Sequence, residues 1–178
     1  MAGWALFDTA VGPCGLVWNA TLQICGGQLP ESGPAQTRAR LQRRFPGLTE
    51  QPPPPAIAGV MARLAAALQG AQDTLDDVPL DLRGVPQFHQ RVYAEARRIP
   101  PGQTRSYGEL ARELGEPTAA RAVGQALGRN PFAPLVPCHR ILAAGSQAGG
   151  FSAPGGLATK LRLLQTEGAQ FGEQAGLF

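Results

Sequence analysis

The feature that most constrains the fold is a pair of short helical patterns joined by a tight turn in the second half of the chain. Ser106 is followed three residues later by Glu109, which matches the capping box at the start of a helix. Gly115 supplies the left-handed residue that commonly ends a helix. After it, Thr118 is expected to cap a second helix over residues 119–128. Two short helices with a glycine-containing turn between them are typical of a helix-turn-helix.

The second of these helices has two contrasting faces. Its apolar side contains Val123, Ala126 and Leu127. The opposite side contains one long cation and three small or polar residues: Arg121, Gly124, Gln125 and Gly128. A glycine inside a helix is less favourable than an alanine by about 1 kcal/mol. Two such glycines suit either a helix pressed into a nucleic-acid groove or tight packing against another helix beside a surface arginine, and the sequence leaves both interpretations open.

A candidate nucleophile lies in the tetrapeptide Pro137-Cys138-His139-Arg140. Cationic groups next to a cysteine lower the pKa of its thiol from about 8.5, which enriches the reactive thiolate at neutral pH. We therefore expect a lowered thiol pKa at Cys138. The alternative is a structural residue, because buried cysteine commonly acts as a small hydrophobe.

The imidazole of His139 needs a partner that orients it, and Glu167 is the candidate. We expect a helix over residues 157–167, ended by Gly168, with three leucines that face the core: Leu157, Leu161 and Leu164. A glutamate in the last helical turn is unfavourable with respect to the helix dipole, and pairing with the imidazole would compensate. The alternative is a solvated surface glutamate.

Positive charge is concentrated in the half of the chain that carries this cysteine. Residues 1–83 contain 6 arginines and 7 acidic residues, whereas residues 84–170 have a net charge of +5. A basic field around a nucleophile favours a polyanion such as a phosphate backbone, although an excess of this size also occurs on ordinary surfaces. The sequence has neither a bilayer-length apolar stretch nor a signal-peptide pattern, so we expect a cytoplasmic protein with no membrane partner.

The three cysteines indicate neither a disulfide framework nor a metal site. Cys14 and Cys25 have no histidine nearby, and a zinc site needs about four ligands in recognisable clusters. We therefore expect reduced thiols, no bound metal and no cofactor.

The predicted fold class is α/β (α+β), with a domain boundary near residue 84. The expected N-terminal elements are a β-meander within residues 3–30, a helix over 34–45, a stiff proline spacer at 52–55, a helix from Ile57 to Leu68 and a short strand at Val78–Leu82. Residues 1–83 would form an N-terminal α/β scaffold domain. Residues 84–178 would form a mainly helical C-terminal domain, the one that contains the candidate helix-turn-helix and Cys138.

Three sequence segments together resemble the O6-alkylguanine-DNA alkyltransferases, which are direct-reversal DNA repair proteins. They are NPFAPLVPCHRIL, GGFSAPGG and the helix end at Glu167-Gly168-Ala169, and the similarity is strongest over residues 84–170. The resemblance implies a ribonuclease H-like N-terminal domain and a winged helix-turn-helix. It also implies a single, irreversible transfer of the alkyl group from O6 of guanine in DNA to Cys138, and it leaves repair of O4-alkylthymine open.

The resemblance assigns catalytic roles to five residues. Cys138 attacks the alkyl carbon, His139 acts as a base through water, and Glu167 orients His139. Asn130 bonds the backbone around the cysteine, and Tyr107 supports the departing guanine and the rotated phosphate. Without the resemblance, Asn130 would be an ordinary Asn-Pro turn residue and Tyr107 a half-buried aromatic.

The partner implied by the resemblance is double-stranded DNA, bound by a monomer through its minor groove with the damaged base rotated out of the stack. Arg121 would fill the vacated space. The other residues expected at the DNA are Ser106, Thr118, Ala120, Gly124 and Gln125.

Backbone groups are expected to read the guanine, at Ile141 and around Phe151 and Ser152. Two additional residues, Ala153-Pro154, separate this aromatic-serine pair from the following Gly-Gly, unlike in many relatives. This departure leaves the range of accepted alkyl groups open.

Two other classes of function fit parts of the sequence. A helix-turn-helix protein that binds damaged DNA without transfer activity would not need Cys138. A cysteine-histidine hydrolase of small substrates would not need the basic C-terminal half. Both are therefore disfavoured.

Overall fold

Three antiparallel strands form a sheet in the N-terminal half of the chain, in the order β1-β2-β3. The computed structural model describes residues 1–143 and 156–169. The strands are β1 (Gly3–Thr9), β2 (Gly12–Trp18) and β3 (Ile24–Gln28), so the predicted meander is confirmed. The register pairs Trp4 with Val17 and Leu16 with Gly27.

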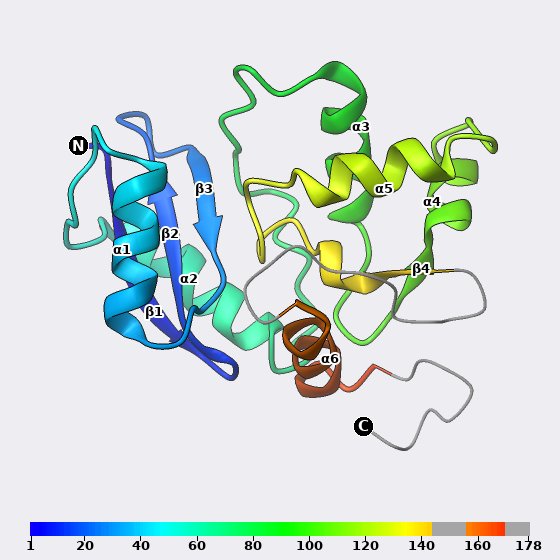
Figure 1. Cartoon of the computed structure of the whole chain (residues 1–178). Coiled ribbons are helices and arrows are strands. Elements are labelled where there is room, and N and C mark those ends of the chain that lie inside the picture. Colours follow the sequence, from blue (N-terminus) through cyan, green and yellow to red (C-terminus); the bar gives the residue numbers. More distant parts are fainter. Residues whose placement is uncertain (144–155, 170–178) are drawn as a thin grey trace.

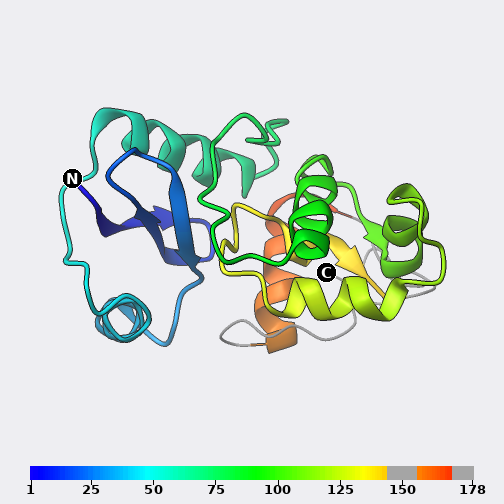
Figure 2. The same cartoon turned by 90° about the horizontal axis from the view of Figure 1, so that it is seen from above.

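Helices α1 (Pro34–Arg44) and α2 (Pro55–Ala67) lie on opposite faces of this sheet (Figures 1 and 2). Alternate strand residues point to opposite faces, because side chains alternate along a strand. Trp4 and Val17 pack with Leu41 of α1, whereas Leu16 and Trp18 belong to the larger core that contains Ile57, Met61 and Leu64 of α2. Both helices agree closely with the predicted ones.

Two details of the N-terminal half differ from the sequence-based expectation. Pro55 is the first residue of α2 rather than the end of a spacer, because a proline at the first helical position loses no hydrogen bond. Residues Val78–Leu82 do not form a strand. Only Leu80 makes an isolated parallel bridge, to Ile24, because the short segment meets the sheet at a single point.

The C-terminal half begins with α3 (Gln87–Ala96), followed by a two-residue strand β4 (Arg105–Ser106) and helix α4 (Tyr107–Glu113). The predicted capping box is present: the Ser106 hydroxyl accepts from the Glu109 N–H at 3.0 Å, and the Glu109 carboxylate accepts from the Ser106 N–H at 2.9 Å. Gly115 has φ +79° and ends the helix as expected.

Helix α5 (Ala120–Gly128) follows after a turn and packs against α4 and α3. The predicted cap at Thr118 is wrong. Ala119 is the N-cap residue, without a side-chain hydrogen bond, and its carbonyl accepts the first helical bond from Val123 at 2.9 Å. The turn that begins at Glu116 extends to Ala119 through a 2.9 Å backbone hydrogen bond, which leaves Thr118 outside the helix and exposed.

A single 3-10 turn, η1 (Cys138–Arg140), leads into β5 (Ile141–Leu142), which pairs in parallel with β4. Helix α6 (Gly156–Thr166) packs against η1 (Figure 1). Its buried residues are Lys160, Leu163 and Leu164, whereas Leu157 is 46% exposed. The expectation that Leu157 faces the core is therefore wrong, because α6 turns its 160/163/164/167 stripe toward η1 and β5.

The main hydrophobic core is continuous between the two halves. It joins α2 residues such as Leu64 to α3, α5 and α6 residues such as Val92, Val123 and Leu163. The architecture is a mixed α/β fold with a small antiparallel sheet. Within residues 1–143 and 156–169, none of the helices is long and apolar enough to span a membrane.

Candidate active site

Cys138 is the first residue of η1, and the preceding loop fixes its backbone. Its N–H donates to the carbonyl of Val136 at 2.9 Å. The Asn130 side-chain amide donates to the same carbonyl at 2.9 Å, and its oxygen accepts from the Phe132 N–H at 2.9 Å. Asn130 therefore closes the loop that ends at the cysteine, where the family resemblance implied a bond to the backbone.

The N-terminal sheet holds the other side of this loop. The Pro131 carbonyl accepts from the Gly27 N–H at 2.9 Å and from the Arg44 guanidinium at 3.2 Å. Arg44 also donates to the Gln28 side chain at 2.9 Å. A Cβ at Gly27 would collide with the Ala133 carbonyl oxygen, so only glycine permits this approach. The segment before the cysteine is thus anchored by β3 and α1.

His139, Arg140 and Glu167 form a buried network behind the cysteine. Glu167 lies directly after α6, and its carboxylate contacts His139 Nε2 at 2.7 Å. Arg140 donates from Nε to both carboxylate oxygens at 3.1 Å and from a terminal nitrogen to Ile99 O at 2.8 Å. The structure therefore brings Glu167 to His139, and it excludes the alternative of a solvated surface glutamate.

The protonation of this network follows from its burial and its partners. Burial alone would raise the pKa of Glu167, but His139 and Arg140 lower it to about 2. Burial lowers the pKa of His139 despite the neighbouring carboxylate, so the imidazole is neutral at pH 7. An ionised carboxylate only accepts hydrogen bonds, so His139 Nε2 carries the proton. The lone pair is then on Nδ1, which makes this nitrogen a base.

The thiol of Cys138 is half-buried, and burial raises its pKa. The expected lowering is therefore wrong for the resting protein, because burial outweighs the stabilising groups. Those groups are the Asn130 side chain, the charge of Lys160 and the N–H groups of Cys138 and His139. In the described residues, Cys138 and His139 make no direct side-chain hydrogen bond. The resting pair is a neutral thiol beside a neutral imidazole.

Sequence reasoning missed two residues of this site, Arg140 and Lys160. The sequence indicates Arg140 only as a member of the tetrapeptide around Cys138, whereas in the structure it binds both carboxylate oxygens of Glu167. Lys160 is buried, and its Nζ donates to the Ile141 carbonyl at 2.8 Å. Two signals could have found Lys160: it is the sole lysine of the chain, and it lies two helical turns before Glu167.

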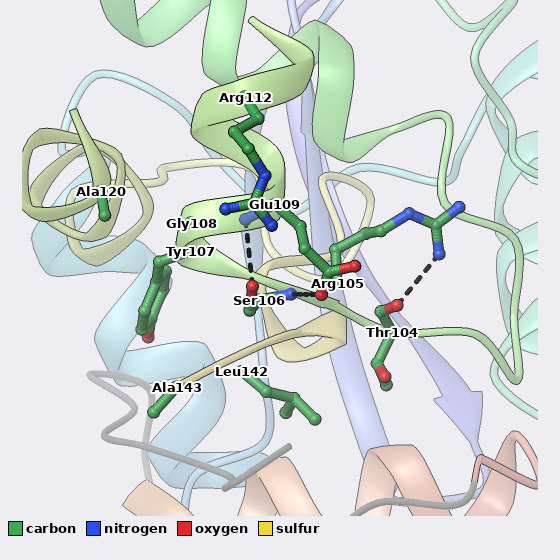
Figure 3. Close-up of a pocket in the computed structure, with 10 residues that line it drawn as sticks. All are labelled: Thr104, Arg105, Ser106, Tyr107, Gly108, Glu109, Arg112, Ala120, Leu142 and Ala143. Carbon is green, nitrogen blue, oxygen red and sulfur yellow. Dashed lines mark hydrogen bonds between the residues drawn. The ribbon is translucent and has the colours of Figure 1, made fainter. Parts of the chain in front are cut away.

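A cavity of about 540 Å³ lies between the starts of α4 and α5 and the end of β5 (Figure 3). Three of the expected DNA or substrate residues line it: Ser106, Tyr107 and Ala120. Cys138 is not one of its lining residues. Tyr107 lines the cavity and also responds to Cys138. Burial raises the pKa of the Tyr107 hydroxyl, and a negative charge on Cys138 raises it further. Figure 3 also shows the capping box that shapes this wall.

Helix α5 has the two faces that the sequence predicted. Val123, Ala126 and Leu127 are buried, whereas Arg121 and Gln125 are exposed. A Cβ at Gly124 or Gly128 would meet nothing within 4 Å among the residues that the structure describes. Within residues 1–143 and 156–169, tight packing therefore does not explain the glycine at position 124, and an external partner at this face remains as the other interpretation.

The remaining predicted residues divide into two groups. Ile141 is buried directly after η1, and its carbonyl accepts a hydrogen bond from Lys160 Nζ at 2.8 Å. Phe151, Ser152, Ala153 and Pro154 lie outside the described residues. Across residues 1–143 and 156–169, no group of three His, Cys, Asp or Glu side chains is placed to hold a metal ion.

Comparisons with known proteins connect this geometry to DNA repair. The DNA-binding domain family of 6-O-methylguanine DNA methyltransferase matches residues 87–169. A methylated-DNA–protein-cysteine methyltransferase of Mycolicibacterium paratuberculosis is 47% identical over 121 residues, which are 68% of this chain and 70% of that protein.

Two solved structures have the same fold over nearly the whole chain. Mycobacterium tuberculosis OGT in complex with DNA is 34% identical with a TM-score of 0.69, and the match covers 93% of this chain and 92% of that one. The O6-methylguanine-DNA methyltransferase of the archaeon Pyrococcus kodakaraensis is 27% identical with a TM-score of 0.72, covering 93% and 99%.

The shared fold, which covers both halves of the chain, and the sequence identity place this protein among the methyltransferases that act on O6-methylguanine in DNA. The chain belongs to the methylated-DNA–protein-cysteine methyltransferase family.

Proposed function

We propose that the protein repairs DNA by direct reversal, taking the alkyl group from O6 of guanine onto Cys138 in a single, irreversible turnover. The observation that carries this proposal is the buried carboxylate of Glu167, which lies 2.7 Å from His139 Nε2. His139 directly follows Cys138, which is half-buried. A relative at 47% identity is a methylated-DNA–protein-cysteine methyltransferase, which supports the same reaction.

The protonation states of the site suggest the order of the chemical step. His139 Nδ1 accepts the thiol proton, through a bridging water, and Glu167 holds the resulting imidazolium. The sulfur attacks the alkyl carbon, the new C–S bond forms, and the bond from that carbon to O6 breaks. The guanine leaves as the anion and takes up one proton, which balances the proton that His139 received from the thiol. The thioether is stable, so the protein is consumed.

The proposed partner is double-stranded DNA, bound by a monomer at the exposed face of α5. The basic C-terminal half supports phosphate contacts, and the open backbone at Gly124 supports close approach of a groove. We propose minor-groove binding with the damaged base rotated out, because a pocket cannot surround O6 inside a stacked pair. The winged helix-turn-helix, the ribonuclease H-like N-terminal half, the boundary near residue 84 and a cytoplasmic location belong to the same proposal.

The acceptor is tested by incubating the protein with excess duplex that contains O6-methylguanine, followed by peptide mass spectrometry. One methyl group should be found on Cys138. Cys138→Ala should abolish this transfer and retain DNA binding, whereas Cys25→Ala, a matched change at another partly exposed thiol, should retain both. A methyl group on Cys14 or Cys25, or sustained turnover, would contradict the proposal.

The role of Arg121 is tested by comparing duplex DNA with free O6-alkylguanine base. Arg121→Ala removes the group that would offset the few kcal/mol of unstacking, so repair of duplex should fall sharply. The free base needs no extrusion and its slower reaction should be nearly unaffected. Arg112→Ala, another exposed arginine, should change mainly the salt-sensitive affinity. Equal loss in both reactions would assign Arg121 to the folding of the site instead.

A further inference from the structure

Many arginines of this chain are paired with acidic residues, and the exposed exceptions lie on a few helices. Among the residues that the structure describes, seven arginines make an ion pair with Asp or Glu. The exposed arginines without an acidic partner in residues 1–143 and 156–169 are Arg40 and Arg43 on α1, Arg112 on α4, Arg121 and Arg129 at α5, and Arg162 on α6. The two on α1 belong to the N-terminal half, outside the proposed DNA contact at α5.

The C-terminal end of α1 gathers three arginines on one face, which we call the α1 cluster. Arg40, Arg43 and Arg44 are spaced by three and four residues, so they are neighbours on the helix, and like charges at this spacing are destabilising. Helix α1 contains no acidic residue of its own. The helix dipole favours cations in the last turn, which contains Arg43 and Arg44 but not Arg40. An anion from outside the chain would offset the repulsion within this cluster.

Arg44 connects the α1 cluster to the end of α5. Its guanidinium donates to the Pro131 carbonyl at 3.2 Å, and Pro131 lies three residues after Gly128, the last residue of α5. Arg129, the C-cap residue of α5, is one of the exposed arginines named above. Cationic residues therefore continue from the C-terminal end of α5 to the α1 cluster.

The outer faces of α1 and α5 lie on the same side of the molecule. In Figure 2 the two helices lie along one edge, whereas α2 lies along the opposite edge of the N-terminal half. Helix α1 packs on the sheet and α5 packs on α3 and α4, so each helix leaves its other face to solvent. DNA is stiff over the size of a small protein, because its persistence length is about 150 base pairs. One straight duplex can therefore touch both faces.

We propose that the duplex bound at α5 continues over the C-terminal end of α1, where Arg40 and Arg43 contact its phosphate groups. This inference rests on the proposed binding of DNA at α5. Phosphate contacts carry no sequence information, so this contact is independent of the lesion and of the bases around it. The N-terminal half thus adds affinity for DNA, besides supporting the loop before Cys138.

The first test measures affinity for undamaged duplex DNA by fluorescence anisotropy over a series of KCl concentrations. Each phosphate contact contributes about 0.9 to the slope of log affinity against log salt. We expect Arg40→Gln and Arg43→Gln each to reduce this slope by about 1, and the double variant to reduce it by about 2. All three variants should react with free O6-alkylguanine base at the natural rate, which shows that the site is intact.

The matched control is Arg38→Gln. Arg38 is also exposed on α1, but it is paired with Glu50 at 3.1 Å, so its loss should leave the salt slope unchanged. An unchanged slope in the Arg40→Gln, Arg43→Gln double variant would overturn the proposal. An equal reduction in Arg38→Gln would also overturn it, because the effect would then come from net charge and not from the α1 cluster.

A second measurement locates the contact relative to the lesion. Cys138→Ala prevents transfer, and in this background O6-methylguanine is placed near the 5′ end or near the 3′ end of its strand. Each duplex then extends past the site in one direction, and only one direction passes α1. The double variant should lose about tenfold or more in affinity for one of the two duplexes only. Equal losses for both would refute the continuation over α1, whereas a natural chain that binds neither duplex would contradict the proposed function itself.

Discussion

Replacing Glu167 by glutamine should weaken both the stability and the reactivity of the site. The substitution leaves Arg140 as a buried cation without its carboxylate, although Arg140 is bonded to both oxygens at 3.1 Å in the native protein. Breaking a buried ion pair in this way costs about 3–5 kcal/mol. This is a large part of the roughly 5–15 kcal/mol that stabilises a typical domain. Urea unfolding at neutral pH measures the loss.

The same substitution should slow alkyl transfer by about 10- to 1,000-fold, because His139 loses the anion that orients its ring and holds its charge. Single-turnover transfer from methylated DNA measures this rate under conditions where the variant is folded. Glu116→Gln is the matched control. It breaks an ion pair with Arg91 in which both side chains are nearly half exposed, so it should cost at most about 1 kcal/mol and leave the rate unchanged. Equal stability and equal rates for the two variants would refute the reasoning.

Three further predictions concern stability. Gly27→Ala should lower the free energy of unfolding by about 1–3 kcal/mol and slow transfer, because the new Cβ collides with the Ala133 carbonyl. Gly59→Ala in α2, where a Cβ meets nothing, should raise the free energy of unfolding by about 0.5–1 kcal/mol. If urea unfolding ranked the two variants in the opposite order, the described packing would be contradicted. Ser106→Ala should cost about 1 kcal/mol through loss of the capping box, and Thr118→Ala should cost nothing measurable in thermal unfolding. The pKa of Glu167 is lowered from 4.5 to about 2 in the folded protein. Its ionised carboxylate therefore stabilises the fold above pH 4.5, and on the order of 3 kcal/mol of the free energy of unfolding is lost as the pH falls toward 2. A urea midpoint independent of pH in that window would disprove this.

Much of the fold could be predicted from local sequence patterns. The capping box at Ser106, the stop at Gly115 and the apolar stripe of α5 are local signals, and the structure reproduces each of them. The wrong predictions concern segments whose exposure or pairing depends on tertiary contacts. Leu157 is exposed because the hydrogen bonds of Lys160 and Glu167 set the rotation of α6, and Val78–Leu82 meets β3 at one residue only.

The candidate site was partly predictable for the same reason. The motif identified Cys138 and His139, and the uncompensated charge at a helix end indicated Glu167. The raised pKa of the Cys138 thiol could not be predicted, because it depends on how deeply the fold buries the sulfur. The role of Arg44 in anchoring the loop could not be predicted either, since its hydrogen bond to Pro131 joins residues 87 positions apart. The roles of the site residues in transfer remain predictions.

The place where Glu167 packs has a consequence for the order in which the protein becomes reactive during synthesis. A Cβ on Gly70 would lie 3.2 Å from the Glu167 carbonyl oxygen, and a Cβ on Gly102 would lie 3.3 Å from it. Two turns that are distant in sequence therefore pack against the residue that follows α6. Both turns and Cys138 leave the ribosome before α6 does. A nascent chain therefore carries the thiol for a time without the Glu167 carboxylate, which directly follows α6. In the proposed reaction, Cys138 therefore gains the carboxylate that holds its base only after α6 has docked, so a chain with an unfinished fold would not be consumed.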